Sequence, residues 1–264
     1  MIRRSIPYSA RILLGVASCV LLVGGYFWMS HRVHIENPRN KTIPNWTQFK
    51  EGWARLSKGE GGVHLGEDAW ASGKRLAGGV ATGIALAFVF GMGMGCLTPL
   101  EAFFMPPIAF FAKIPPTAML AVYFVFVGVT GNRIFVSLIA LGIFPTLAQA
   151  IAQAAKKDVD AHAINKSYTL GASHFEVAWE VIFKQILPRI LDNVRLQIGP
   201  AMVFLIAAEW ALADVGFGYT LRMQSRLQNM NIVYTYLILL GIFGLALDQA
   251  LTLFRRKWCP WFGE

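Results

Sequence analysis

The chain has 264 residues, of which 55% are hydrophobic and only 15% are charged, and its mean hydropathy is +0.49. Soluble domains carry about a quarter charged residues, so this composition excludes an ordinary soluble protein. The net charge of +9 fits membrane topology and contact with anionic lipid. Outside the apolar segments, the sequence does not show the alternating basic and aromatic residues that are typical of a nucleic-acid-binding surface. We therefore expect no nucleic-acid partner.

Six apolar segments are long enough to cross a hydrocarbon core of ~30 Å as helices. None of them alternates with period two, so a β-barrel is excluded. The sequence therefore predicts an all-α polytopic membrane protein. Its expected spans are about residues 12–29, 76–97, 103–127, 134–155, 194–213 and 232–254.

Lys and Arg gather in three places, at residues 3–11, 156–189 and 255–257. A six-span count puts all three on one side of the membrane, and the positive-inside rule makes that side cytoplasmic. Both termini are therefore expected in the cytoplasm. Four parts follow, namely an anchor helix at 1–30, an external segment at 31–70, a core at 71–255 with a cytoplasmic loop at about 156–190, and a tail at 256–264.

The first apolar segment begins like a signal peptide but is too long for one. Tyr26-Phe27-Trp28-Met29 is also a poor cleavage site, so we expect the segment to remain as an anchor. In the external segment, Trp46, Phe49 and Trp53 follow at helical spacing. They predict a short helix on the membrane surface.

The second span is rich in glycine. Gly79 and Gly83 are four residues apart, as are Gly91 and Gly95. Such spacings let helix backbones approach closely. We expect tight packing here, with a sliding interface as the alternative.

The third span contains two double prolines and a lysine. Prolines remove backbone donors, which hydrocarbon tolerates only where protein or a water-filled cavity satisfies the freed carbonyls. Lys113, beside Pro115 and Pro116, would lie ~15 Å deep by helical rise. A charge at that depth needs a partner, and Glu209 in the fifth span is the candidate. These four residues are candidates for lining a solute path, and a purely structural Lys113–Glu209 pair is the alternative.

The connection between the fourth and fifth spans is long and polar, with a glycine break between two amphipathic helical patterns. Gly171 can end one helix and turn the chain into the next. The alternative is an amphipathic helix on the lipid surface. The candidate contact residues of this loop are Asn165, Ser167, Tyr168, Leu170, Gly171, Ala172, Ser173 and Phe175.

A second candidate surface follows the fifth span, on the predicted outer side. Asp214, Gly216, Gly218 and Tyr219 begin a polar hairpin that leads to the sixth span. This hairpin is expected to form an external gate or docking surface.

Motifs of catalysis are missing from the sequence. There is no phosphate-binding Gly-x-x-x-x-Gly-Lys-Ser/Thr, no Gly-x-Ser-x-Gly and no His-Glu-x-x-His,. The five histidines are scattered, and the three cysteines have no metal-ligand spacing,. We predict no catalytic residue, no metal site and no cofactor in this chain.

Four elements, in order, resemble the permeases of binding-protein-dependent ABC importers. Residues 112–118 resemble the family's basic-x-Ile-Pro-Pro-x-Ala element, and residues 142–145 its Gly-x-Phe-Pro turn. Residues 170–173 with 186–188 resemble its cytoplasmic loop, and Ala208-Glu209 with residues 216–219 its Ala-Glu … Gly-Leu-Gly-Tyr pattern. The resemblance covers about residues 68–255 and is nearest to the nitrate, sulfonate, taurine and bicarbonate branch. Asn165-Lys166-Ser167 departs from the family's Glu-Ala-Ala, and Phe183-Lys184 from its first Leu-Pro.

The resemblance implies a type I importer permease fold, with residues 71–255 as the permease core. It implies an inner-membrane subunit that passes a small, in this branch anionic, solute delivered by an external binding protein. Separate ATPase subunits would bind ATP and Mg and would contact the loop at about residues 165–179. A second permease copy or a paralogue would complete the channel. The alternatives are an ion-coupled secondary carrier with a relay of ionisable residues and a non-transporting membrane scaffold.

Overall fold

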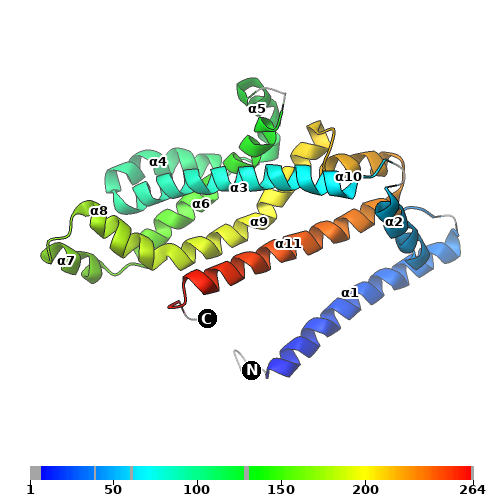
Figure 1. The fold of residues 1–264 in the computed structure, drawn as a ribbon, viewed down its shortest axis with the longest axis horizontal. Coiled ribbons are helices and arrows are strands. Elements are labelled where there is room, and N and C mark those ends of the chain that lie inside the picture. Colours follow the sequence, from blue (N-terminus) through cyan, green and yellow to red (C-terminus); the bar gives the residue numbers. More distant parts are fainter. Residues whose placement is uncertain (1–6, 39, 60–61, 128–130, 263–264) are drawn as a thin grey trace. The chain divides into compact units, whose positions relative to one another are not determined.

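The computed structural model describes residues 7–38, 40–59, 62–127 and 131–262, and the regular elements in these ranges are all helices (Figure 1). In chain order they are α1 (Tyr8–Glu36), α2 (Trp46–Lys58), α3 (Leu65–Cys96), α4 (Thr98–Phe111), η1 (Pro116–Met119), α5 (Leu120–Val127), α6 (Arg133–Lys157), α7 (Ala161–Thr169), α8 (His174–Glu176), η2 (Val177–Phe183), α9 (Lys184–Leu212), α10 (Phe217–Arg226) and α11 (Met230–Trp258). Five described helices are long and apolar enough to cross a membrane, or six if one bent pair counts as a span. The predicted all-α polytopic class is confirmed.

The chain divides into two compact units. One comprises Met1–Leu65 and Leu221–Ile238, and the other Gly66–Thr220 and Leu239–Glu264. The candidate site residues of the sequence all belong to the second unit.

The first unit is built around α1, α2 and the beginning of α11. Asn45 caps α2 by accepting a hydrogen bond from the Gln48 backbone, and the Gln48 side chain accepts one from the Asn45 backbone,. This reciprocal cap fixes where α2 begins. The helix predicted from the spacing of Trp46, Phe49 and Trp53 forms, and its place on the membrane surface stays a prediction.

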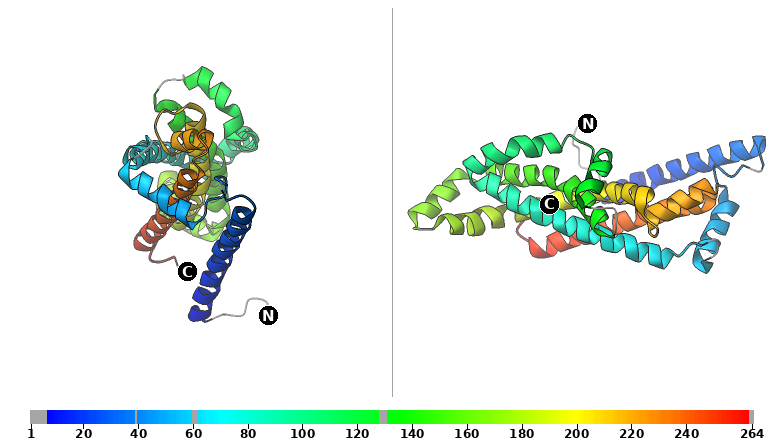
Figure 2. Two further views of the ribbon diagram at one scale, coloured as in Figure 1. Left: turned by 90° about the vertical axis from the view of Figure 1, so that its right-hand side faces the viewer. Right: turned by 90° about the horizontal axis from the view of Figure 1, so that it is seen from above.

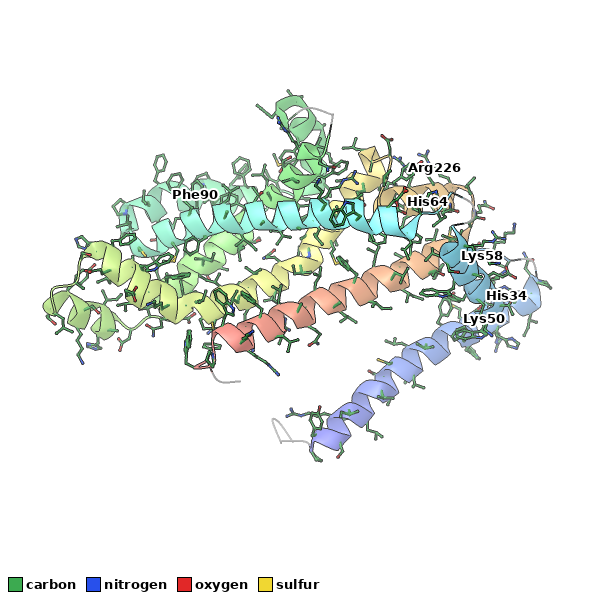
Figure 3. All side chains as sticks on the ribbon, in the orientation of Figure 1. His34, Lys50, Lys58, His64, Phe90 and Arg226 are labelled. Carbon is green, nitrogen blue, oxygen red and sulfur yellow. The ribbon has the colours of Figure 1, made fainter. Side chains whose placement is uncertain are left out.

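In the second unit, α6 packs against both α3 and α9 (Figure 2). The glycines of α3 set its distance from α6, because an added Cβ at Gly79 would lie 2.5 Å from Ile139, and one at Gly83 would lie 2.6 Å from Ile143. The predicted close packing of the glycine-rich helix is therefore confirmed. Aromatic side chains extend the contact, since Phe90 of α3 (Figure 3) meets the rings of Phe104 and Phe144 at 5.0 and 5.4 Å.

The predicted third span is not one continuous helix. The segments Thr98–Phe111 and Pro116–Tyr123 are bent against each other by 86°. The other proline-containing element behaves in the opposite way. Pro145 lies inside α6 instead of forming the expected turn, and the nearby Thr146 hydroxyl donates to the Ile143 carbonyl at 3.0 Å.

The long fourth-to-fifth connection is more helical than expected. From His174 the chain stays helical to Leu212, through a π-helical stretch at η2. The fifth span therefore begins as a continuation of the loop's second helix. Movement of that loop can pass directly along α9.

Candidate functional site

The break after α4 is dictated by its second proline pair. Each proline disfavours helical backbone in the residue before it, which favours an end to the helix before Ile114 and Pro115. Pro115 is extended, with φ −60° and ψ 122°. Pro106 and Pro107 sit inside α4 without ending it. The result is a short non-helical connection at residues 112–115 in the middle of an apolar segment.

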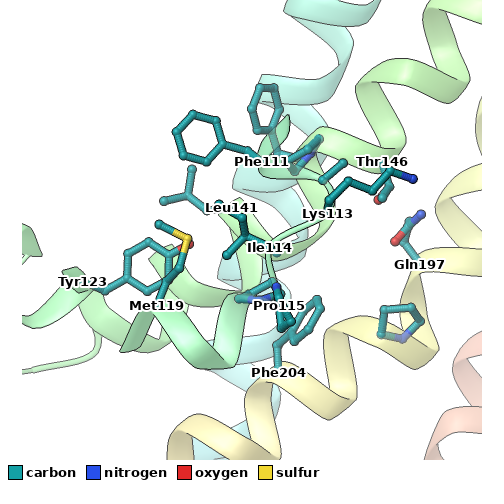
Figure 4. Close-up of a pocket in the computed structure, with 16 residues that line it drawn as sticks. Phe111, Lys113, Ile114, Pro115, Met119, Tyr123, Leu141, Thr146, Gln197 and Phe204 are labelled. Atoms are coloured by element: carbon teal, nitrogen blue, oxygen red, sulfur yellow. The ribbon is translucent and has the colours of Figure 1, made fainter. Parts of the chain in front are cut away.

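The connection forms one wall of a pocket of about 650 Å³ (Figure 4). The other walls come from η1 and α5, from α6 and from α9. The lining residues are Phe111, Ala112, Lys113, Ile114, Pro115, Pro116, Met119, Tyr123, Leu141, Gly142, Phe144, Pro145, Thr146, Gln197, Pro200 and Phe204. This volume is in the range of small-molecule sites, roughly 300–1,000 Å³.

The charged group and the amide of this pocket lie on one side of it (Figure 4). Figure 4 shows Lys113, Thr146 and Gln197 close to one another, with Tyr123 and Met119 on the opposite side. Lys113 is the one charged residue among the described lining residues. The arrangement places an ammonium, a hydroxyl and a carboxamide beside a large apolar surface.

The expected pairing of Lys113 with Glu209 is wrong. The Glu209 carboxylate is paired with the Arg75 guanidinium at 2.8 Å, and it does not line the Lys113 pocket. Arg75 is the residue that pairs with Glu209 because it lies on α3 beside the end of α9. Lys113 lies elsewhere, in the connection after α4. Within the described part of the chain, the Lys113 side chain has neither a hydrogen bond nor an ion pair. The place of Glu209 on a solute path stays a prediction.

Glu209 is the centre of a buried polar network between α3, α9 and the hairpin that follows. Its carboxylate is fully buried and also accepts from the Ser72 hydroxyl at 2.8 Å and from the Gly218 backbone at 2.9 Å. Arg75 donates in addition to Asn132 at 3.0 Å and to the Val215 carbonyl at 2.7 Å. Several donors and acceptors thus satisfy an ion pair that would be costly in isolation.

The hairpin glycines are required by this network. Gly216 has φ 128°, and a Cβ there would lie 2.6 Å from a Glu209 oxygen. A Cβ on Gly218 would lie 2.6 Å from the Ile206 carbonyl. Asp68 of α3 completes the attachment by accepting from the Gly216 backbone at 2.9 Å and from the Thr220 hydroxyl at 2.6 Å.

The predicted gate residues therefore take different positions. Gly216 and Gly218 are buried against Glu209, Tyr219 is half-buried, and Asp214 is exposed. The structure fixes the hairpin to α3, and its function as a gate or docking surface stays a prediction.

The predicted coupling loop is a helix–turn–helix. Gly171 has φ 90°, a conformation that favours glycine, and its backbone N–H donates to the Tyr168 carbonyl at 3.0 Å,. Ser173 then caps the next helix, with Glu176 completing a capping box,. Tyr168 and His174 close the turn through a side-chain contact of 2.9 Å between Oη and Nδ1.

Two large apolar side chains project from this turn. Leu170 is 80% exposed and Phe175 is 76% exposed, while Ala172 packs against the core. Asn165 is exposed on α7, and Ser167 bonds back to the Ala163 carbonyl at 2.9 Å. The turn therefore presents a rigid, partly apolar knob, as expected, and its contact with an ATPase stays a prediction.

Sequence reasoning missed the α3 side of the polar network. Asp68, Ser72 and Arg75 lie at positions i, i+4 and i+7, which share one helix face,. We expected the second span to begin at residue 76, so these polar residues were placed outside it. Gln197 was missed because a single amide within an apolar run carries little signal.

Comparison with known proteins identifies the class that these features define. The family described as "Binding-protein-dependent transport system inner membrane component" matches residues 79–258. The chain is 31% identical over 195 residues to a probable ABC transporter permease protein of Brucella melitensis biotype 1, which covers 74% of this chain and 78% of that protein.

The names of two further relatives specify a substrate. The taurine transport system permease protein TauC of Escherichia coli (strain K12) is 30% identical over 174 residues, 66% of this chain and 62% of TauC. The putative aliphatic sulfonates transport permease protein SsuC of Bacillus subtilis (strain 168) is 26% identical over 187 residues, 67% of this chain and 66% of that protein.

The fold and the site define a polytopic helical transport subunit. The chain belongs to the family of inner-membrane components of binding-protein-dependent transport systems. It is an ABC importer permease subunit and not an enzyme, and its family works with an ATPase and a substrate-binding protein. The predicted family and branch are confirmed.

Proposed function

We propose that this permease passes a small organic anion of the sulfonate type through a path that includes the Lys113 pocket. The observation that carries the proposal is the Lys113 ammonium, which has no partner among the described residues and lies in a pocket of about 650 Å³ at the break of a membrane span. A charge inside the membrane marks a functional site by default, because leaving it there unpaired is costly. A transiting anion would supply the missing partner.

The pocket lining suits a solute with an anionic group at one end and a carbon chain at the other. Lys113, Thr146 and Gln197 offer donors to a compact anionic group, whereas Phe111, Tyr123 and other apolar residues offer contact to a carbon chain. Taurine and aliphatic sulfonates, which the names of two relatives specify, combine a sulfonate with a short carbon chain. Lys113 is exposed in the single chain, so we propose that a second permease copy or a paralogue completes the path.

Energy for transport would come from partner subunits. We propose that the knob of Leu170 and Phe175 contacts an ATPase that holds ATP and Mg, with both termini of this chain on the same cytoplasmic side. The unbroken helix from His174 to Leu212 supports this, since it joins the knob to Gln197 and Pro200 of the pocket. No cofactor is expected in the chain itself.

An ion-coupled carrier is the weaker alternative. Its relay would need Lys113, Glu209 and Asp214 to exchange protons or ions. Glu209, however, is fully buried and bonded to Arg75, Ser72 and Gly218. A non-transporting scaffold would have no use for the charged pocket. The importer interpretation accounts for both features.

The test is uptake by the permease assembled with its ATPase and binding protein, using radiolabelled taurine and butanesulfonate as probes. Lys113→Met should lower the uptake of both about tenfold or more, because a charge-assisted hydrogen bond contributes about 1.5–3 kcal/mol. Lys113→Arg should retain most of the uptake. Lys74→Met, which removes an exposed lysine on α3, is the matched control and should transport normally. Wild-type uptake by Lys113→Met, at equal protein level in the membrane, would refute the proposed path.

A further inference from the structure

A second cavity, of about 660 Å³, lies within the first unit and has no part in the transport site described above. Its walls are α1, α2 and the beginning of α11. We call it the aromatic groove, and it is lined by Leu22, Val23, Tyr26, Phe27, Trp46, Phe49, Lys50, Trp53, Tyr234, Thr235 and Ile238. Most of its lining residues are apolar, so it suits an apolar occupant.

Specific contacts hold the walls of the groove in place. The Tyr26 hydroxyl donates to the Pro44 carbonyl at 2.9 Å, and the buried Ser30 hydroxyl donates to the same carbonyl at 3.2 Å. These bonds fix α1 to the turn that precedes α2. On the other side, a Cβ on Gly52 would lie 2.6 Å from the Asn231 carbonyl, so glycine lets α2 pack directly on α11.

The lining is a set of aromatic rings packed edge to face. Phe49 of α2 lies 6.0 Å from Tyr26 of α1 and 6.1 Å from Tyr234 of α11, measured between ring centroids. Phe27 and Trp46 form a similar pair at 5.7 Å. The apolar part of α1 is not buried inside the described chain. A groove beside such a helix opens to lipid, so an acyl chain fits its chemistry.

Charge at the groove identifies the kind of lipid. Lys50 is a lining residue, and its Nζ lies 5.7 Å from the centroid of the Trp46 ring (Figure 3). Residues 31–58 contain six Lys and Arg against two Glu, a balance of 6 − 2 = +4. Lys41, Arg55 and Lys58 of this stretch are exposed. Clusters of basic residues at a membrane surface attract anionic lipid headgroups.

We propose that the aromatic groove is a binding site for an anionic phospholipid. One acyl chain lies along the rings of Tyr26, Phe49 and Tyr234, and the phosphate is held by Lys50. This site is independent of the transported solute. Its lipid would hold α1 and α2 against α11 and so stabilise the first unit.

The test is native mass spectrometry of the full-length protein in mild detergent, with phosphatidylglycerol and phosphatidylcholine of identical acyl chains as probes. The wild type should retain phosphatidylglycerol in preference to phosphatidylcholine. Lys50→Gln should lower the retention of phosphatidylglycerol about fivefold, because one cation near an anionic headgroup has an effect of that order. It should lower that of phosphatidylcholine less, because the choline ammonium already balances the charge of that lipid's phosphate. Lys74→Gln, which changes an exposed lysine outside both the groove lining and the basic stretch of residues 31–58, is the control and should behave as wild type.

A second pair of variants tests the groove itself. Val23 lines the groove and is 55% exposed, whereas Val20 is 64% exposed and does not line it. Val23→Trp should fill the groove and lower the retention of both lipids, while Val20→Trp should not. The proposal is overturned if the wild type retains the two lipids equally, if Val23→Trp binds as well as Val20→Trp, or if two protein chains associate through the groove without lipid.

Discussion

The Arg75 guanidinium lies 2.8 Å from the fully buried Glu209 carboxylate, and its carbon Cζ lies 4.1 Å above the Phe135 ring. The pair joins α3 to the end of α9. Because Gly218 donates to the same carboxylate and Arg75 donates to the Val215 carbonyl, the hairpin after α9 is tied to both helices. A displacement of α9 relative to α3 would therefore have to break this network or carry the hairpin with it.

Removing Arg75 should leave an uncompensated buried charge. We expect Arg75→Met to destabilise the protein by about 3–5 kcal/mol, since breaking one side of a buried ion pair has this effect. The measurement is the thermal stability of the purified protein in detergent, together with its level in the membrane. Lys74→Met, one residue away and exposed, should show neither effect.

A double variant separates the ion pair from simple loss of packing. Arg75→Met combined with Glu209→Gln removes both charges, so it should be more stable than Arg75→Met alone. Equal instability of the single and double variants would show that the pair itself contributes little.

The close packing of α3 on α6 should be sensitive to the size of the side chains at its glycine positions. A Cβ at Gly91 would lie 2.7 Å from the Ile151 Cβ and 2.9 Å from the Ala148 carbonyl. Gly91→Val should therefore cost about 1–3 kcal/mol through overpacking, visible as a lower melting temperature. Gly73→Val is the control on the same helix, because nothing lies within 4 Å of its Cβ position. A melting temperature of Gly91→Val equal to that of the control would mean that the helices separate freely, as a sliding interface requires.

Local features of the fold could be predicted from the sequence, whereas contacts between residues far apart in the sequence could not. The break at Pro115 and the turn at Gly171 follow from backbone restrictions that act within a few residues. The partner of Glu209 depends on which cation the fold brings to it, and Lys113 and Arg75 were both available in the sequence. Arg75 is 134 residues away along the chain, and only the packing of α3 beside α9 selects it.

The pocket interpretation predicts water access at the broken span. Ile114 lines the Lys113 pocket, whereas Phe103 of α4 is exposed outside it. In a background from which the free cysteines Cys19, Cys96 and Cys259 are removed, Ile114→Cys should react with a charged thiol reagent in at least one nucleotide state of the assembled transporter. Phe103→Cys, an apolar position of α4 outside the pocket, is the control and should stay unreactive. Protection of Ile114→Cys in every state would place the break in lipid or in packed protein.

The turn at Gly171 should be needed for coupling rather than for folding. Its φ of 90° is costly for a β-branched residue, and its Cβ position is open, with nothing within 4 Å,. Gly171→Val should therefore displace Leu170 and Phe175 without disturbing the core. We expect normal insertion into the membrane but a loss of solute uptake per ATP hydrolysed.

The control is Gly15→Val, because Gly15 lies within α1 and its Cβ position is also open. Uptake and ATP hydrolysis are measured on the same preparations, so a weaker ATPase contact is distinguished from a broken path. If the knob transmits the ATPase movement, Gly171→Val should hydrolyse ATP with little dependence on the loaded binding protein, while Gly15→Val keeps that dependence. Lys113→Met should instead keep the dependence of ATP hydrolysis on the loaded binding protein and lose uptake. In that variant the knob is intact and only the passage of the anion is impaired. Coupled transport at the wild-type rate by Gly171→Val would remove the turn from the ATPase contact and leave the pocket proposal untouched.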